Sequence, residues 1–213
     1  MNFSSVIYLS SAAVLITAFY IQGQRYLISA IKGQLIQSII IAAIAFILGY
    51  TEKSFDLVIL GILLFFLRGV LITYLLVERV PMKKAYYFES GINVPYLFLV
   101  DLVFMVLSVF ILYSIAFSGL IPVTLPDSPQ NLLFPLLLFF QGLFLITSRR
   151  STFTQIVGYV EEENALVLFA MFLLPVPIVI EASVFLDVLA LVVISSVITV
   201  EKVNHEQMEE LRG

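Results

Sequence analysis

Three ionisable residues, Arg68, Glu163 and Asp187, stand near the middle of long apolar stretches of the chain. A charged side chain at the centre of a bilayer costs at least about 2.5–3.5 kcal/mol on insertion scales, so such residues persist where they have partners or water and a function. Burial favours the neutral form of a carboxyl group and a neighbouring arginine favours the charged form, so the two together can exchange protons. These residues therefore indicate a relay for protons or cations. The alternative is a set of static ion pairs that join helices of this chain or of a partner subunit.

Three consecutive glutamates, Glu161, Glu162 and Glu163, occupy one of these stretches. Successive residues turn by about 100° around a helix, so at least one of the three points away from any single inward face. We predict Glu163 as a principal relay carboxylate and Glu162 as a second choice. For Glu161 the relay stands against the alternative that it faces a partner or water.

Other stretches contribute the remaining candidates. Asp187 is predicted as the second principal carboxylate, Glu181 as a member nearer the outside, and Arg68 as the charge that tunes the acids. Asp101 lies nearer the cytoplasm, where it is either a relay member or part of the cytoplasmic interface. The polar residues that complete the set of candidates are Asn164 and Gln37.

Seven apolar stretches position these residues. With 213 residues, of which 61% are hydrophobic and 12% charged, the composition lies outside the range of soluble globular domains. Each stretch is near the roughly 17–25 residues that a helix needs to cross a bilayer. We predict an all-α integral membrane protein with seven transmembrane helices in these stretches: Phe3 to Gln22, Gln34 to Tyr50, Leu57 to Val77, Val94 to Phe117, Leu132 to Thr147, Thr152 to Leu173 and Ile178 to Val200.

The basic residues predict the orientation of these helices. Nine of the eleven lysines and arginines fall on one side of a seven-span arrangement: Arg25, Lys32, Arg79, Lys83, Lys84, Arg149, Arg150, Lys202 and Arg212. The opposite side carries only Lys53, and Arg68 lies within a span. By the positive-inside rule the N-terminus is outside and the C-terminus is cytoplasmic.

The connections between the stretches are short, which predicts one helical bundle without a soluble domain. A proline-containing loop divides it into a four-helix N-terminal half, residues 1–120, and a three-helix C-terminal half, residues 121–213, with a short cytoplasmic tail. A faint repeat relates the halves at an offset of 125 residues, because Arg25, Gly33 and Gln37 have the same spacing as Arg150, Gly158 and Glu162. Chance and duplication are equal alternatives for these three matches.

Several classes of function are disfavoured by what the sequence lacks. It contains no cysteine, which excludes thiolate metal sites and iron–sulfur ligation by this chain, and its single histidine, His205, is in the polar tail. The first apolar stretch has no basic region before it, so we expect a retained span and not a cleaved signal peptide. No nucleotide loop, nucleophile triad or nucleic-acid surface is recognisable. We do not expect the chain to be an enzyme by itself, and we expect no cofactor in it.

The run from Arg150 to Asn164 and the later run from Glu181 to Asp187 resemble the C-terminal half of the hydrogenase-4 component E family. These proteins are membrane subunits of formate hydrogenlyase and related energy-converting hydrogenases. That half is similar to the K-type subunit of complex I and to the C-type subunit of multisubunit cation/proton antiporters. The family pattern maps onto Arg150, Gly158, Tyr159, Glu163 and Asn164, and its later acids onto Glu181 and Asp187.

The resemblance is specific only from Arg149 to Asp187, and it departs from the related subunits at two positions. Val160 stands where the complex I subunit places its span carboxylate, and Arg68 stands where the family tends to have lysine. The resemblance implies a non-redox subunit that supplies carboxylates to a proton or sodium path in a prokaryotic cytoplasmic membrane. Nickel–iron and iron–sulfur centres are then expected in partner subunits, and lipid and other membrane subunits are the expected partners. The alternatives are a subunit of a cation/proton antiporter and a structural scaffold.

Overall fold

A computed structural model describes residues 3–79, 93–117, 130–173 and 176–210. The helices are α1 (Phe3–Gly23), α2 (Leu27–Thr51), α6 (Val94–Phe117), α7 (Gln130–Ser148), α8 (Thr152–Leu173) and α9 (Val176–Glu210), and one further rod is built from α3 (Phe55–Leu63), η1 (Leu64–Ile72) and α4 (Thr73–Arg79). The described ranges contain no strand, which confirms the predicted all-α class. The predicted division near residue 120 lies outside them.

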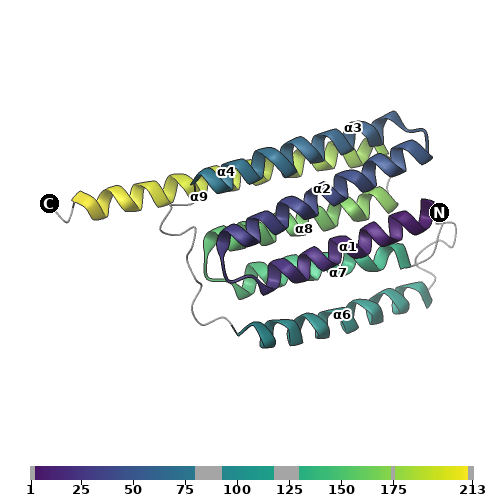
Figure 1. Ribbon diagram of the computed structural model, residues 1–213, viewed down its shortest axis with the longest axis horizontal. Coiled ribbons are helices and arrows are strands. Elements are labelled where there is room, and N and C mark those ends of the chain that lie inside the picture. Colours follow the sequence, from purple (N-terminus) through teal and green to yellow (C-terminus); the bar gives the residue numbers. More distant parts are fainter. Residues whose placement is uncertain (1–2, 80–92, 118–129, 174–175, 211–213) are drawn as a thin grey trace.

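Five of these helices are long and apolar enough to cross a membrane: α1, α2, the rod from α3 to α4, α6 and the first part of α9. The other two are α7, whose apolar segment Leu132–Ser148 is shorter, and α8, which carries three glutamates in its middle. The length and composition of these helices are compatible with a multi-pass membrane protein. α9 continues as a helix to Glu210, so the predicted tail is an extension of this helix that projects beyond the bundle (Figure 1).

The helices form two layers (Figure 1). One layer consists of α1, α2 and the α3–α4 rod, and the other consists of α7, α8 and α9. Each helix of one layer packs on a helix of the other layer. α1 contacts α7, α2 contacts α8, and α3 contacts α9. α6 lies at the edge, against α1 and α7.

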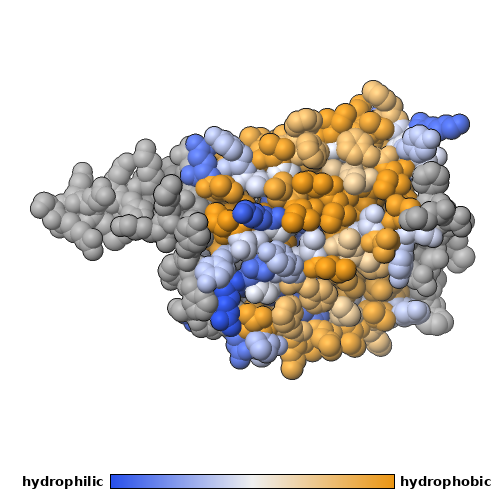
Figure 2. Space-filling model, in the orientation of Figure 1, coloured by the Kyte–Doolittle hydropathy of each residue, from blue (hydrophilic) through white to orange (hydrophobic). Residues whose placement is uncertain are grey.

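Polar residues divide the interior of this bundle into two apolar cores. One core contains Ile41, Leu60 and Leu168, and the other, displaced along the helix axes, contains Ile31, Ile72 and Val157. Between them α2, η1, α8 and α9 carry a layer of buried polar and charged side chains: Gln34, Gln37, Ser38, Arg68, Glu161, Glu163, Asn164, Ser183 and Asp187. The outer face is mostly hydrophobic along the bundle, with hydrophilic residues gathered mainly near the end from which α9 projects (Figure 2).

The helix ends match the offset of 125 residues that the sequence suggested. α1 and α7 end at Gly23 and Ser148, and α2 and α8 begin at Leu27 and Thr152, so both pairs differ by 125. The close contact inside each hairpin is also equivalent. A Cβ atom on Gly33 would lie 2.6 Å from Ile21 Cγ1, and one on Gly158 would lie 3.0 Å from Ile146 Cγ1. These coincidences favour duplication over chance for the hairpins α1–α2 and α7–α8, and they confirm that both glycines permit close helix approach.

Candidate functional site

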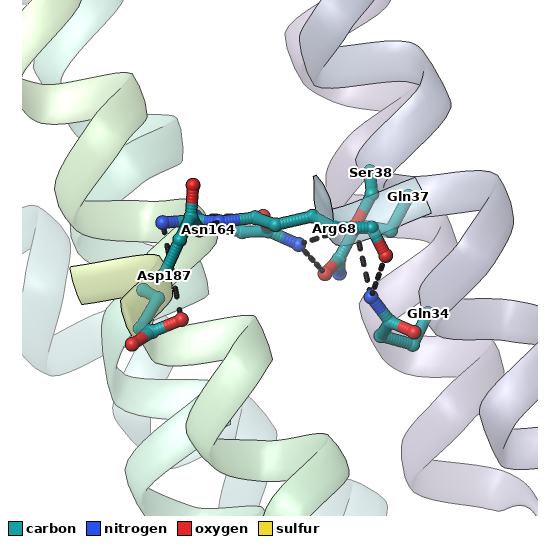
Figure 3. Close-up of polar contacts among 7 residues, drawn as sticks. Gln34, Gln37, Ser38, Arg68, Asn164 and Asp187 are labelled. Atoms are coloured by element: carbon teal, nitrogen blue, oxygen red, sulfur yellow. Dashed lines mark hydrogen bonds and ion pairs between the residues drawn. The ribbon is translucent and has the colours of Figure 1, made fainter. Parts of the chain in front are cut away.

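Arg68 is the centre of the charged layer, and its side chain is 0% exposed. Its Nε donates to Asp187 Oδ1 at 2.5 Å, and its Nη1 donates to Asn164 Oδ1 at 3.1 Å. Its Nη2 lies 3.8 Å from Glu163 Oε2. One guanidinium therefore joins the α3–α4 rod to α8 and α9, and Figure 3 shows it lying across the space between the helices.

The two carboxylates are held differently. Asp187 makes a direct, charge-assisted hydrogen bond, whereas the Glu163 contact is an ion pair beyond hydrogen-bond distance. Neither oxygen of Glu163 has a hydrogen-bond partner in the part of the chain that the structure describes. The Tyr159 hydroxyl, one turn earlier on α8, is within electrostatic range of Glu163 but does not form a hydrogen bond of normal geometry with it. Asp187 is thus anchored through Oδ1, while its Oδ2 and both oxygens of Glu163 have no hydrogen-bond partner within the described residues.

The backbone that carries Arg68 is a π-helix, η1, in the middle of an otherwise α-helical rod. π-helical turns insert an extra residue into the helix and occur frequently at functional sites. The Arg68 carbonyl accepts from Gln34 Nε2 at 3.5 Å, and Gln34 also binds Ser38 Oγ at 3.0 Å and Thr73 Oγ1 at 3.2 Å. α2 therefore supports the π-helical segment from the side opposite the acids.

Asn164 connects the charged residues to this neutral group. Its Oδ1 accepts from Arg68, while its Nδ2 donates to Gln37 Oε1 at 2.9 Å and to Ser38 Oγ at 3.3 Å (Figure 3). The sequence named Asn164 and Gln37 as candidates but missed Gln34, Ser38 and Thr73. The signal was present for two of them, because Gln34, Gln37 and Ser38 have the spacing of one helix face.

The consecutive glutamates divide between the two sides of α8, as their spacing predicts. Glu163 is buried against Arg68, and Glu162 is half-buried. Glu161 is also buried, at 1% exposure, but its electrostatic neighbour is Asp101 of α6. Glu161 and Asp101 therefore belong to a second charged group that is separate from the Arg68 group.

Glu181 is not brought into either group. It lies on α9 six residues before Asp187, and its side chain is exposed on the surface of this chain. A relay role for Glu181 would require a partner subunit against this face.

The described part of the chain contains no group of three or more His, Cys, Asp or Glu side chains that could hold a metal ion. What the Arg68 group can do is bind a cation of single charge. A guanidinium, which does not lose its proton in proteins, faces two carboxylates, so the group carries one negative charge in excess when both acids are ionised. Comparisons of the chain with protein families, with curated proteins and with solved structures find no match.

Proposed function

We propose that this chain is a membrane subunit that carries protons or sodium ions through a buried site made by Arg68, Asp187 and Glu163. The observation that supports this function is the excess carboxylate in the buried polar layer. Both acids are 1% exposed, and the single buried guanidinium between them compensates only one. An uncompensated buried charge is strongly unfavourable, so the group takes up a proton or a monovalent cation. Uptake and release of that cation is one step of a relay.

Within this proposal the two acids have different roles. Asp187 stays paired with Arg68 and fixes its orientation, because the 2.5 Å hydrogen bond is charge-assisted. Glu163 takes up and releases the cation, because both of its oxygens lack hydrogen bonds within the described residues. Asn164 accepts a hydrogen bond from Arg68 Nη1, so the guanidinium keeps its position when the cation binds or leaves.

The membrane arrangement that we propose has seven spans, an outside N-terminus and a cytoplasmic C-terminus. The turn with Arg25 and the turn with Arg149 and Arg150 lie at the same end of the bundle, while the turn with Lys53 lies at the other (Figure 1). This distribution supports the positive-inside orientation. α7 and α8 count as spans in this proposal, because they lie alongside α1 and α2 along most of their length.

The assembly that we propose for this subunit is a complex I-like, energy-converting hydrogenase of the formate hydrogenlyase type in a prokaryotic cytoplasmic membrane. The support is the resemblance of the segment from Arg149 to Asp187 to the hydrogenase-4 component E family. The burial of Glu163, Asn164 and Asp187 in one group adds to it. Partner subunits would contain the nickel–iron and iron–sulfur centres. A cation/proton antiporter would use the same group without a redox arm, and the subunits that copurify with the chain distinguish the two assemblies.

A structural scaffold is the second candidate, and one observation favours it. The short Arg68–Asp187 ion pair joins two helices through residues that are 119 positions apart in the chain. An ion pair with a purely structural role would do the same. The two roles differ at Glu163, because a scaffold does not need a carboxylate with unused acceptors.

The deciding experiment measures coupled ion transport by the assembled complex in proteoliposomes after Glu163→Gln. We expect the complex to assemble normally and to keep its redox reaction. Ion transport should fall at least about tenfold, because the amide keeps the shape of the side chain but cannot carry a proton. Glu52→Gln is the matched control, since Glu52 is exposed in the α2–α3 turn. Transport equal to that of the parent would refute the relay, and loss of assembly without a separate transport defect would favour the scaffold.

A further inference from the structure

A second buried charged group lies on the other side of α8 from Arg68. Its members are Asp101 of α6, Glu161 of α8 and Arg149, which directly follows α7. All three are buried, with exposures of 2%, 1% and 3%. Asp101 is within electrostatic range of both Arg149 and Glu161.

Aromatic contacts on α6 show independently where Asp101 points. Phe98, three residues before it, packs on Phe19 and Gly23 of α1. Phe104, three residues after it, stacks on Phe140 of α7 with ring centroids 5.7 Å apart. Residues three apart share one helix face, so Asp101 points inward, toward the groove between α1 and α7.

Arg149 closes the same groove from its end. Its Nη2 donates to the Gln22 carbonyl at the end of α1, so the guanidinium is fixed between α1 and α7. The side-chain Nε2 of Gln22 is itself buried and has no hydrogen-bond partner within the described residues. Both acids lie deeper in the bundle than Arg149. With a helical rise of about 1.5 Å per residue, Asp101 is about 10 Å from the start of α6, and Glu161 is about 14 Å from the start of α8.

The carboxylate of Asp101 has unused acceptor capacity. Both of its carboxylate oxygens are buried without a hydrogen-bond partner in the part of the chain that the structure describes. Such atoms are rare and require an explanation such as an unseen water or ion. Two buried carboxylates and one buried guanidinium in this group again leave one negative charge in excess, as in the Arg68 group.

We propose that Asp101 and Glu161 form a second cation site that takes up one proton. Glu161 and Glu163 are two residues apart, about 200° around α8, so the two sites lie on opposite sides of one helix. The chain would then have two separate single-proton sites, each made of two acids and one arginine. This inference goes beyond the proposed function and does not depend on transport through Glu163.

Infrared spectroscopy of the full chain in lipid nanodiscs at neutral pH tests this site, because a protonated carboxyl group has its own carbonyl-stretch band. We expect Asp101→Asn to remove one such band, Glu161→Gln to remove one, and the double variant to remove no more than either single change. The reason is that the single positive charge of Arg149 compensates the one acid that remains, which is then ionised. Glu52→Gln, which changes an exposed acid, should remove none.

Three results would overturn the inference. Loss of two bands in the double variant means two independently protonated acids, and loss of none means that the pair is ionised. A band that is present only after sodium is removed means that the pair holds sodium. If the double variant does not fold, the two single variants still test the site, because loss of no band in either would show that the pair is ionised. The same loss in a Glu163→Gln background keeps this result separate from the Arg68 group and from failure of the proposed function.

Discussion

Arg68 Nε lies 2.5 Å from Asp187 Oδ1, although the two residues are 119 positions apart in the chain. This pair joins the first layer of helices to the second at the level where the apolar cores are interrupted. Its burial makes the consequences of substitution large and dependent on which partner is changed.

Removing Arg68 should destabilise the chain more than removing both members of the pair. Breaking a buried ion pair typically costs about 3–5 kcal/mol, because the remaining charge is left uncompensated. We expect thermal stability in detergent to fall in the order parent, Arg68→Lys, Arg68→Met, since lysine keeps the charge but loses the bidentate reach to Asp187 and Asn164. The double variant Arg68→Met with Asp187→Asn should recover part of the loss. A double variant that is additive in its two losses would show that the residues are not coupled.

The two carboxylates should respond differently to conversion into amides. Asp187→Asn removes a charge-assisted hydrogen bond from Arg68, whereas Glu163→Gln removes a contact of 3.8 Å. We therefore expect the melting temperature to fall more for Asp187→Asn than for Glu163→Gln. Asp56→Asn and Glu52→Gln are exposed counterparts that control for the chemical change. The reverse order would mean that Glu163, and not Asp187, anchors the guanidinium.

Orientation can be measured cleanly because the chain has no cysteine. Single cysteines at Gln24 and Ser151 report on the two turns at one end, and a cysteine at Glu52 reports on the turn at the other. In intact cells a membrane-impermeant maleimide should label only Glu52→Cys, because its turn is expected outside. Labelling of Gln24→Cys and not Glu52→Cys would reverse the proposed topology, and opposite results at Gln24 and Ser151 would contradict the arrangement of the hairpins.

Close helix approach predicts different costs for alanine at different glycines. At Gly158 a Cβ atom would lie 3.0 Å from Ile146 and 3.1 Å from the Gly142 carbonyl oxygen, so Gly158→Ala should cost about 1–3 kcal/mol of stability through overpacking. At Gly69 the nearest atom would be 3.9 Å away, which makes Gly69→Ala the control. Equal melting temperatures for both variants would show that the hairpin can open without loss.

Composition and apolar length were enough to predict an all-helical membrane protein, because each helix satisfies its own backbone hydrogen bonds. Charge within apolar stretches correctly singled out Arg68, Glu163 and Asp187, which the structure brings together. Periodicity could not make Asp101 an electrostatic neighbour of Glu161, because that relationship depends on how α6 packs at the edge of the bundle. The π-helix at Arg68 and the contribution of Gln34 were also beyond the sequence, since both depend on contacts between helices.

The matched hairpins have a consequence for how the two charged groups arose. Applying the offset of 125 residues, Gln37 and Ser38 of α2 are the counterparts of Glu162 and Glu163 of α8. Asn164 donates to both of these neutral residues, so the two equivalent helices contact each other at the positions where α2 has neutral residues in place of acids. After duplication, the α7–α8 hairpin would have acquired the acids, and the α1–α2 hairpin would supply neutral side chains that bind them through Asn164. Divergence at three consecutive positions, where Ile36, Gln37 and Ser38 correspond to Glu161, Glu162 and Glu163, then distinguishes the ionisable hairpin from the supporting one.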